Sequence, residues 1–541
     1  MRMSNTRRQT SLPALAIAAA LLLASGPAEA AASTAVVRHG ARTDPAVALT
    51  FDDGWTGAGA LRIARVLLAK DAHATFLPYG AAVWQSPAIF DWIAAQPGFE
   101  IANHTATHDI LCIATTSGCL SSGVSMGREI VGGRLIISGL IGRPLLNVLR
   151  PPGGNYNGAV LAAAVAAGYP AITLWDVSAA DTAARTSAAV RSNMDKAGNG
   201  SIVLAHMGPT TTMAALPDVV DDLRAAGHPL ATLSELLSLP AEPAQVAHDY
   251  ATGGFGPAGG TGPRWQPSEV LDGAGHRYLA WTQPDGVWYA TNASGAWLAE
   301  QVAVSTAGAV YYEQPSIVRS STGTLRIALV RETEADTTVL LATRTATGWV
   351  SADVPGQLGF ASTPSLALHG STIYLAYREQ GQWDTTTTPA SWSRAGLYLA
   401  TYAAGAWSTQ KFSLEGADMN PSVAVDPLTG RPVVAFRART RVSGMLPRGV
   451  WLAVRGASSW SYVKISSREA YPTLKIGSSG RRYVLMSDAM STSLRYASAL
   501  PGHAFWWRTV GYGLQGALVR PGRAVAITIS GGHDALKEIR F

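Results

Sequence analysis

Two patterns of hydrophobic positions divide the chain. From about residue 35 to residue 239, short apolar runs alternate with longer runs of helical period. AVALTF, ATFLPYG, FEIANH, AITLWDV and SIVLAHM predict strands, and AGALRIARVLLAKD, PAIFDWIAAQ, GAVLAAAVAAG and LPDVVDDLRAAG predict helices. This alternation predicts an α/β fold with a mainly parallel sheet or barrel wrapped in helices. In such folds the reactive residues lie at the carboxyl ends of strands.

Beyond residue 264 the helical period disappears and short alternating strands recur. The phrase QPSEV returns as QPSIV, TPSLA, NPSVA and YPTLK, with prolines at 267, 315, 364, 421 and 472. A period near fifty residues that carries several strands is typical of a propeller. A sixth unit is visible without its proline, so residues 264–541 predict an all-β six-bladed propeller. A tryptophan leads the fourth strand of most units, and we expect these side chains to pack between blades.

Two further segments complete the predicted organisation. Residues 1–30 resemble a secretion signal, because Arg2, Arg7 and Arg8 precede an apolar run that ends in the small-residue site AEA. A membrane anchor is the alternative, but the run is short for a membrane span. Residues 240–263 are rich in Ala, Gly and Pro and predict a linker between the domain at 35–239 and the propeller. We therefore expect an exported protein with no membrane span after cleavage.

Composition and net charge indicate how many domains the chain can form and which binding partners they favour. The 541 residues are 47% hydrophobic and 14% charged, which is enough to bury more than one core. A net charge of +6 is too weak over this length to predict nucleic-acid binding, although it would not oppose an anionic cell wall. The two cysteines, Cys112 and Cys119, predict one local disulfide in an exported protein. Two metal-binding thiolates are the alternative, but they lack the short spacing and further ligands of such a site.

The first candidate site residues are the adjacent carboxylates Asp52 and Asp53, which follow the predicted strand ALTF. A solvated turn would explain them alone, since Asp and Gly are turn residues. However, NHTATHD places His104 and His108 four residues apart, which on a helical turn puts two imidazoles on one face. With one carboxylate, Asp53, they would make a three-ligand metal site that leaves a position for water, as in catalytic zinc centres. Asp52 is then left free as a base.

These residues carry a family resemblance. TFDDG, HTATH, RPPGG, LWDVSAAD and VLAHMG occur in the order and spacing of the polysaccharide deacetylase family, and the resemblance covers residues 35–239. It implies a distorted (β/α) barrel that removes N-acetyl groups from an extracellular polysaccharide such as chitin, poly-N-acetylglucosamine or peptidoglycan. It also implies that Asp53, His104 and His108 bind Zn²⁺ or another divalent transition metal. Asp52 would be the general base, and Arg150 would keep that base ionised.

The same resemblance assigns the remaining site residues. His206 would protonate the leaving amine, and the Gly153 N–H would stabilise the oxyanion. Leu204 and Trp175 would line the substrate pocket. The fourth motif departs from the family, because Ser178 and Thr182 stand where many relatives have Asp and Trp. The Asp of relatives orients the acid histidine, and either Asp176 or Asp181 could substitute for it; the residues alone do not decide between them.

Two other functions stay open at this point. An O-acetyl esterase acting on xylan-like glycans would use the same site. A catalytically idle glycan-binding or adhesion protein would explain the altered fourth motif. In each case the propeller is expected to bind a glycan, the cell wall or a protein. The expected location is secreted, either extracellular or in the periplasm and cell envelope.

Overall fold

The computed structural model describes most of the chain. The predicted signal peptide, the linker up to residue 262 and Cys119 lie outside the described residues, so the predicted disulfide stays a prediction. Within the described part, no helix is long and apolar enough to cross a membrane. The structure describes residues 35–112, 123–239, 263–380, 382–384, 391–393, 395–413, 419–439, 446–468, 470–488, 490–491, 493–513, 515–530 and 533–541.

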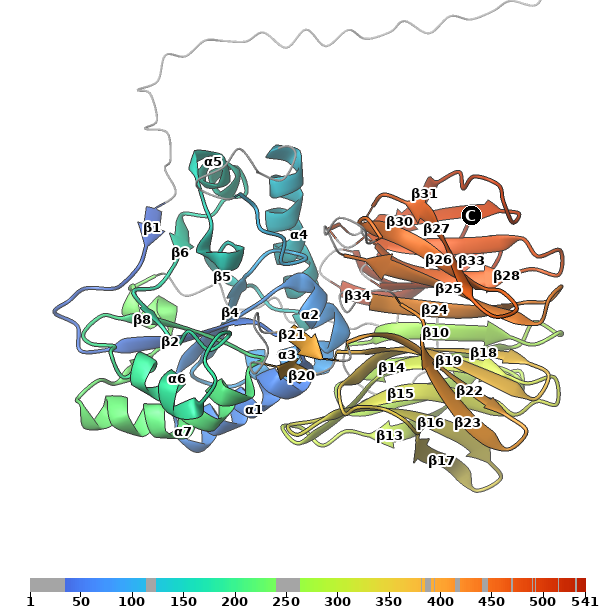
Figure 1. Cartoon of the computed structure of the whole chain (residues 1–541), viewed down its shortest axis with the longest axis horizontal. Coiled ribbons are helices and arrows are strands. Elements are labelled where there is room, and N and C mark those ends of the chain that lie inside the picture. The colour runs from blue at the N-terminus through green and yellow to red at the C-terminus, as the bar shows by residue number, and fades with distance from the viewer. Residues whose placement is uncertain are drawn as a thin grey trace, which may run out of the picture.

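The first part of the chain folds around a parallel sheet with strand order β1-β6-β5-β4-β3-β2-β8-β7, and β9 pairs with β2 (Figure 1). This curled sheet with its helices confirms the predicted (β/α) fold. The strands are β1 (Ala35–Val37), β2 (Val47–Asp53), β3 (Ala74–Pro78), β4 (Phe99–Asn103), β5 (Leu146–Leu149), β6 (Ala171–Thr173), β7 (Val177–Ser178), β8 (Ile202–His206) and β9 (Leu230–Ala231). The helices are α1 (Gly57–Ala69), α2 (Gly80–Gln85), α3 (Pro87–Ala94), α4 (Gly123–Ile141), α5 (Gly158–Ala166), α6 (Ser187–Met194), α7 (Thr210–Ala225) and α8 (Leu233–Leu236).

The central strand β2 shows why these residues form a buried sheet. All seven of its residues are buried, as expected for a parallel strand covered on both faces. Val47, Leu49 and Phe51 pack into one hydrophobic cluster, and Ala48 packs into another on the opposite face. The charged residues come only at its carboxyl end, where the two carboxylates follow Phe51. The strand thus delivers both acids to one edge of the sheet.

The second part forms six small antiparallel sheets arranged as the predicted six-bladed propeller (Figure 1). The sixth blade has three strands where the others have four. The first three blades are β10 (Trp265–Leu271), β11 (Arg277–Gln283), β12 (Gly286–Thr291) and β13 (Leu298–Val304); β14 (Val310–Arg319), β15 (Leu325–Thr333), β16 (Thr337–Thr345) and β17 (Gly348–Asp353); and β18 (Ala361–His369), β19 (Thr372–Glu379), β22 (Gly396–Ala403) and β23 (Ala406–Lys411). A two-stranded ribbon, β20 (Gln382–Asp384) and β21 (Ser391–Ser393), projects from the third blade.

The remaining blades follow the same plan. They are β24 (Met419–Asp426), β25 (Arg431–Ala438), β26 (Gly449–Arg455) and β27 (Trp460–Ser466); β28 (Ala470–Ile476), β29 (Arg482–Asp488), β30 (Ser493–Ala499) and β31 (Arg508–Tyr512); and β32 (Gln515–Arg520), β33 (Arg523–Ser530) and β34 (His533–Arg540).

The repeated Pro-Ser phrase joins each blade to the next. Ser316 Oγ accepts a hydrogen bond from Leu366 N of the following blade at 2.9 Å, and Ser268, Ser365, Ser422 and Thr473 act in the same way. In the first four blades the residue before the proline has a positive φ and a bulge interrupts the strand pairing there. The repeat therefore joins the six blades in sequence, while the Gln515 side chain accepts from Gln266 N where the sixth blade meets the first. The side chains before the prolines lie at the mouth of the central channel.

The predicted role of the tryptophans matches their contacts. Trp349 packs edge-on against Tyr289 of the preceding blade, with ring centroids 5.3 Å apart. Trp460 packs against Phe412, which follows the last strand of the preceding blade, at 5.1 Å. These rings fill the space between neighbouring sheets.

The carboxyl end of α2 inserts into the mouth of the propeller channel, where Trp84 lies beside residues of all six blades. Trp84 stacks on Tyr471 with ring centroids 4.2 Å apart. The Gln266 amide donates to the carbonyl oxygens of both Trp84 and Gln85 at 3.2 and 3.0 Å. The amides of Gln314 and Gln515 donate to the Gln85 and Trp84 carbonyl oxygens at 2.7 and 3.1 Å. Gln266 and Gln314, which precede repeated prolines, and Gln515 of the sixth blade thus bind the end of α2 to the propeller.

We expect Ser316→Ala to lower the free energy of unfolding by about 1 kcal/mol, because it removes one hydrogen bond between blades. Chemical denaturation followed by tryptophan fluorescence measures the change. Ser351→Ala, at an exposed position of β17, serves as the control and should leave stability unchanged. Equal stability of the Ser316 variant and the parent would contradict this role of the repeat.

Candidate active site

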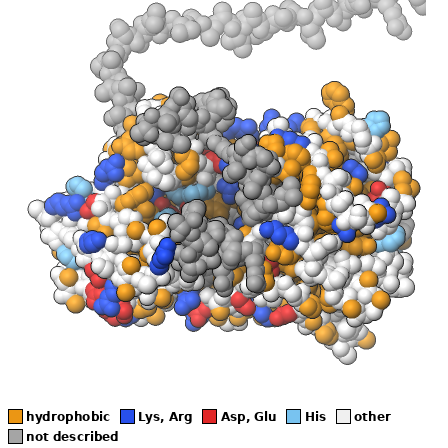
Figure 2. All heavy atoms as spheres, in the orientation of Figure 1, with side chains coloured by type: hydrophobic (Ala, Val, Ile, Leu, Met, Phe, Trp, Pro, Cys, Tyr) orange, Lys and Arg blue, Asp and Glu red, His pale blue; other side chains and the backbone are white. Residues whose placement is uncertain are grey.

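The carboxyl edge of the parallel sheet gathers the residues predicted from the sequence. Strands β2 and β8 pair in parallel so that Asp52 lies opposite His206. His104 follows β4, and Arg150 follows β5. Figure 2 shows histidine side chains near the middle of the molecule, where its two parts meet.

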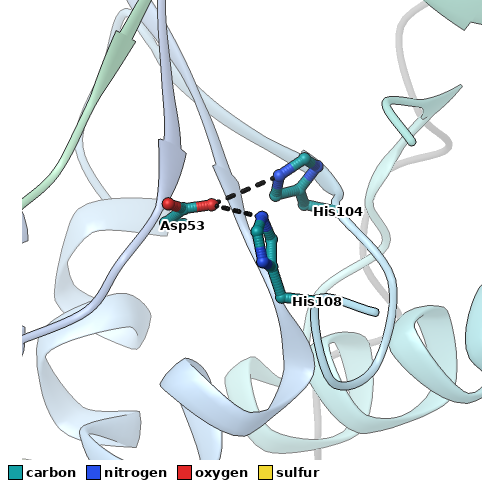
Figure 3. A group of neighbouring side chains, drawn as sticks. All are labelled: Asp53, His104 and His108. Carbon is teal, nitrogen blue, oxygen red and sulfur yellow. Dashed lines mark ion pairs between the residues drawn. The ribbon is translucent and has the colours of Figure 1, made fainter. Parts of the chain in front are cut away.

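Asp53, His104 and His108 point toward one another (Figure 3). Asp53 Oδ1 lies 3.3 Å from His104 Nε2 and 2.9 Å from His108 Nε2. Asp53 and His104 are buried, and the His108 side chain keeps 30% of its surface exposed. The cluster is therefore closed on the protein side and open at His108.

The donor atoms of this cluster fit a metal ion. His104 Nδ1 donates to the Arg150 carbonyl oxygen at 2.8 Å, which leaves the Nε2 lone pair facing Asp53. Asp53 Oδ1 is buried and accepts no hydrogen bond of good geometry from the described residues. Two imidazole nitrogens and one carboxylate are the donor set of catalytic zinc sites. Burial raises the pKa of the Asp53 carboxyl, but His108 and His104 outweigh burial and hold this pKa well below its usual range.

The two histidines lie on a loop, which corrects the expectation of a helical turn. Residues 104–109, here named the metal loop, include Thr105 at φ 71° and His108 at φ 63°. Asp53 has φ 78° as well. Such left-handed conformations are strained for residues with a Cβ and persist only where the surroundings hold them. The four-residue spacing therefore brings the imidazoles together through a strained loop.

Asp52 is held by a fully buried arginine. Arg150 Nη1 donates to Asp52 Oδ1 at 2.7 Å and to Thr50 Oγ1 at 2.8 Å. The other guanidinium nitrogens donate to the carbonyl oxygens of Thr173 and Leu174 at 3.3 and 3.1 Å. This network satisfies the guanidinium and fixes Oδ1, so that Asp52 Oδ2, 3.7 Å from His104 Nε2, faces the metal cluster.

His206 is paired with Asp181. Its Nδ1 lies 2.7 Å from Asp181 Oδ1, and Asp181 Oδ2 accepts from His206 N and from Thr212 Oγ1 at 2.8 and 2.6 Å. Burial lowers the pKa of His206, but the hydrogen bond to Asp181 and the charges of Asp53 and Asp52 outweigh burial and raise this pKa to about 9. The pairing with Asp181 thus favours the protonated imidazole, which is the form that a proton donor requires.

The structure distinguishes the two aspartates that the sequence leaves as alternatives. Asp176 instead pairs with Arg42 at 2.7 Å and accepts from Ser201 Oγ and Ile202 N. Asp181 is thus the partner of His206. The sequence signal for it was its place in the motif LWDVSAAD, which offers two candidate aspartates without ranking them.

The expected pocket residues lie around this centre. Gly153 sits in the short 3₁₀ turn after Arg150 with φ 65°, and its backbone is exposed. Trp175 packs beside Arg150, 5.7 Å from guanidinium carbon to ring centroid, and against Gly154. Leu204 lies two residues before His206 on β8, so both side chains point to the same face.

Two aromatic neighbours of the site were not predicted. Trp55 stacks on His206 with ring centroids 5.9 Å apart, and the Tyr79 ring lies 5.6 Å from that of His108. Trp55 directly follows the aspartate pair in DDGW, and Tyr79 follows β3 at the same edge of the sheet. Their positions just after the carboxyl ends of predicted strands could have indicated that they lie near the site.

Comparisons with known proteins agree with this site. Residues 39–172 match the family model described as polysaccharide deacetylase. A peptidoglycan-N-acetylglucosamine deacetylase of Bacillus cereus is 32% identical over 35% of this chain and 87% of that protein. The peptidoglycan-N-acetylmuramic acid deacetylase PdaC of Bacillus subtilis is 29% identical over 35% of this chain and 38% of that protein. A chitooligosaccharide deacetylase of Sinorhizobium fredii is 31% identical over 30% of this chain and 73% of that protein.

The chain therefore belongs to the polysaccharide deacetylase family, and the three relatives named above are deacetylases. The segment matched by the family model lies within the first part of the structure and contains the aspartate pair, the metal loop and Arg150.

We expect Asp181→Asn to lower the pKa of His206 by about one unit or more, because it removes the carboxylate that stabilises the imidazolium. NMR titration of the His206 ring in the metal-free protein measures this change. Asp176→Asn is the matched control and should leave the His206 pKa unchanged. An unchanged pKa in Asp181→Asn, or an equal fall in both variants, would contradict the pairing.

Proposed function

We propose that the chain is an exported, zinc-dependent deacetylase that removes N-acetyl groups from a polysaccharide. The observation that carries this proposal is the meeting of three groups at one sheet edge. These groups are the ligand set Asp53, His104 and His108, the pair Asp52–Arg150, and the imidazole of His206 paired with Asp181. An amide hydrolase needs a polarised carbonyl, a base for the attacking water and an acid for the leaving amine, and these groups can supply all three.

The substrate we propose is a glycan that contains N-acetylglucosamine, with peptidoglycan first and chitin-like or poly-N-acetylglucosamine chains next. Support comes from the names of the relatives, which are deacetylases of peptidoglycan and of chitooligosaccharides. The cleavage chemistry is the same for each, because every one of them presents an acetamide on a sugar ring.

On the base side, Asp52 takes a proton from the attacking water. Zn²⁺ bound by Asp53, His104 and His108 supplies Lewis-acid polarisation of the acetamide carbonyl and a water of lowered pKa. Arg150 pairs with Asp52 and fixes its orientation through Oδ1, which leaves Oδ2 to accept the proton. The two adjacent carboxylates thus divide the work between ligand and base.

On the acid side, His206 gives its proton to the amine nitrogen as the carbon–nitrogen bond breaks. Asp181 orients the ring and stabilises its protonated form. The Gly153 N–H would donate to the oxyanion of the tetrahedral intermediate. Leu204 and Trp175 would bound the space for the acetyl group and the sugar.

Location and the propeller complete the proposal. We propose that residues 1–30 direct export and that residues 35–239 and 264–541 are separate domains joined by the linker at 240–263. The propeller is proposed to bind a glycan or the cell wall and so bring the catalytic domain to its substrate. Cys112 and Cys119 are proposed to form a disulfide in the exported protein.

The argument for a catalytically idle protein is weakened by the structure around His206. The catalytically idle alternative was suggested by Ser178 and Thr182 in the fourth motif, but Asp181 fills the place of the missing carboxylate beside His206. The O-acetyl esterase remains an outcome of the substrate test, because the same groups can cleave an ester.

We expect the metal-loaded protein to release acetate from peptidoglycan or N-acetylglucosamine oligomers, and chelation to abolish this activity. Asp52→Asn should lower kcat by about 10² to 10⁴ fold, because it removes the base while the three ligands stay in place. Asp221→Asn, which changes an exposed aspartate on α7, is the control and should keep full activity.

An assay of released acetate across a substrate panel separates the outcomes. No acetate from any glycan, beside an active deacetylase control, would overturn the proposed function. Release from acetylated xylan alone would assign an esterase. Full activity of Asp52→Asn would remove Asp52 as the base.

A further inference from the structure

The metal loop depends on its surroundings for its shape. Two of its residues, Thr105 and His108, have left-handed backbone conformations at φ 71° and 63°. His108 is a predicted ligand, so relaxation of this strain would move its imidazole away from Asp53. The contacts that hold the loop therefore decide whether the three donor atoms meet.

Contacts within the catalytic part hold one side of the loop. Gly80 N and Ala81 N, at the start of α2, donate to the carbonyl oxygens of Thr105 and Ala106, each at 2.9 Å. Glu129 of α4 accepts from both Thr107 N and Thr107 Oγ1, at 2.9 and 2.6 Å. These bonds leave the Thr107 carbonyl and the Asp109 carboxylate to other partners.

The propeller supplies those partners. The Arg439 guanidinium donates to the Thr107 carbonyl oxygen, and Arg448 forms a two-pronged ion pair with Asp109. Asp109 is 6% exposed, so its charge needs a close cation. Arg439 follows β25 and Arg448 precedes β26, so the fourth blade contributes both side chains.

The elements that hold the other side of the loop also rest on the propeller. The far end of α2 enters the channel mouth, where the glutamine amides bind the Trp84 and Gln85 carbonyls. For α4, Arg128 pairs with Asp488 at 3.0 Å, and the Leu140 carbonyl accepts from Trp265 Nε1 at 2.9 Å. Helices α2 and α4, which hold the other side of the loop, are therefore both bonded to blades of the propeller.

We propose that Arg439 and Arg448 are positioning residues of the metal site, and that the propeller holds the metal loop in its ligating conformation. This inference rests on the proposed function of the cluster as a metal centre. It gives the propeller a second role, independent of any glycan that it binds. Arg448 acts through Asp109, the residue after His108. Arg439 acts through the backbone carbonyl of Thr107, the residue before His108.

The test measures zinc affinity by competition with a chromophoric chelator in the full chain. Arg448→Ala is expected to weaken zinc binding by about tenfold or more, and Arg439→Ala together with Arg448→Ala by a larger factor, as for other residues that support metal ligands. Arg448→Lys should recover part of the affinity, because it restores the charge without the second hydrogen bond. Circular dichroism checks that each variant is folded.

Arg65→Ala is the matched control. Arg65 on α1 pairs with Glu334 of the propeller at 2.9 Å, so this change removes an ion pair between the same two parts but away from the metal loop. Its zinc affinity should equal that of the parent. A loss as large as that of Arg448→Ala would mean that general weakening of the contact between the two parts explains the effect, and would overturn the proposal.

Kinetics separate positioning from substrate contact. The activity lost in Arg448→Ala should return at saturating zinc, with KM close to that of the parent. Unchanged zinc affinity in both arginine variants would overturn the proposal, and so would a raised KM that excess zinc does not correct. Zinc affinity is measured without substrate. If the parent binds zinc but releases no acetate, the proposed function is overturned, whereas the zinc affinities of the arginine variants still decide this inference.

Discussion

Two carboxylates on consecutive residues are buried at the end of β2, and each must have its own positive partner. Burying an unpaired charge costs several kcal/mol, and two like charges side by side add repulsion. The positive partner of Asp52 is Arg150, whose buried guanidinium also donates to Thr50 and to two backbone carbonyl oxygens. Asp53 instead faces the two imidazoles of the metal loop, which together with it would hold a metal cation as its positive partner. The rest of the site is arranged around this division.

The division requires a break in the strand. Successive side chains of a regular strand point to opposite faces, so Asp52 and Asp53 would diverge. The left-handed conformation of Asp53 ends the strand there and lets both carboxylates approach His104, at 3.7 and 3.3 Å. Strain at Asp53, Thr105 and His108 is thus part of how the cluster is assembled, and the neighbouring helices and the propeller hold it in place.

Much of the fold followed from the sequence. The apolar runs gave the strands of the parallel sheet, and the period near fifty residues gave the six blades. Helix α4 was not predicted, because it carries glycines at 123, 127, 132, 133 and 139, which weaken a helical pattern. Two of these glycines have a packing reason. A Cβ on Gly133 would clash with Asn103 Oδ1, and one on Gly132 would lie 2.5 Å from the Met490 carbonyl oxygen of the propeller.

The site was predictable in its residues but less so in its geometry. The motifs identified the aspartates, the histidines and Arg150, whereas the HxxxH spacing suggested a helical turn in place of a strained loop. Spacing alone could not choose between Asp176 and Asp181, because that choice depends on which side chain the strand end turns toward His206. The role of the glutamines before the repeated prolines was also hidden. Their side chains bind the Trp84 and Gln85 carbonyls from 182 and 229 residues away in the sequence.

The central claim is that one divalent metal ion sits between Asp53, His104 and His108 while Asp52 stays outside its coordination. Anomalous X-ray scattering at the zinc edge, from crystals of the zinc-loaded protein, tests it most directly. The account predicts one strong peak bound to the Asp53 carboxylate and to Nε2 of both histidines, with Asp52 still paired to Arg150. A peak at any other group of side chains, or a zinc ion that takes Asp52 as its ligand, would contradict it.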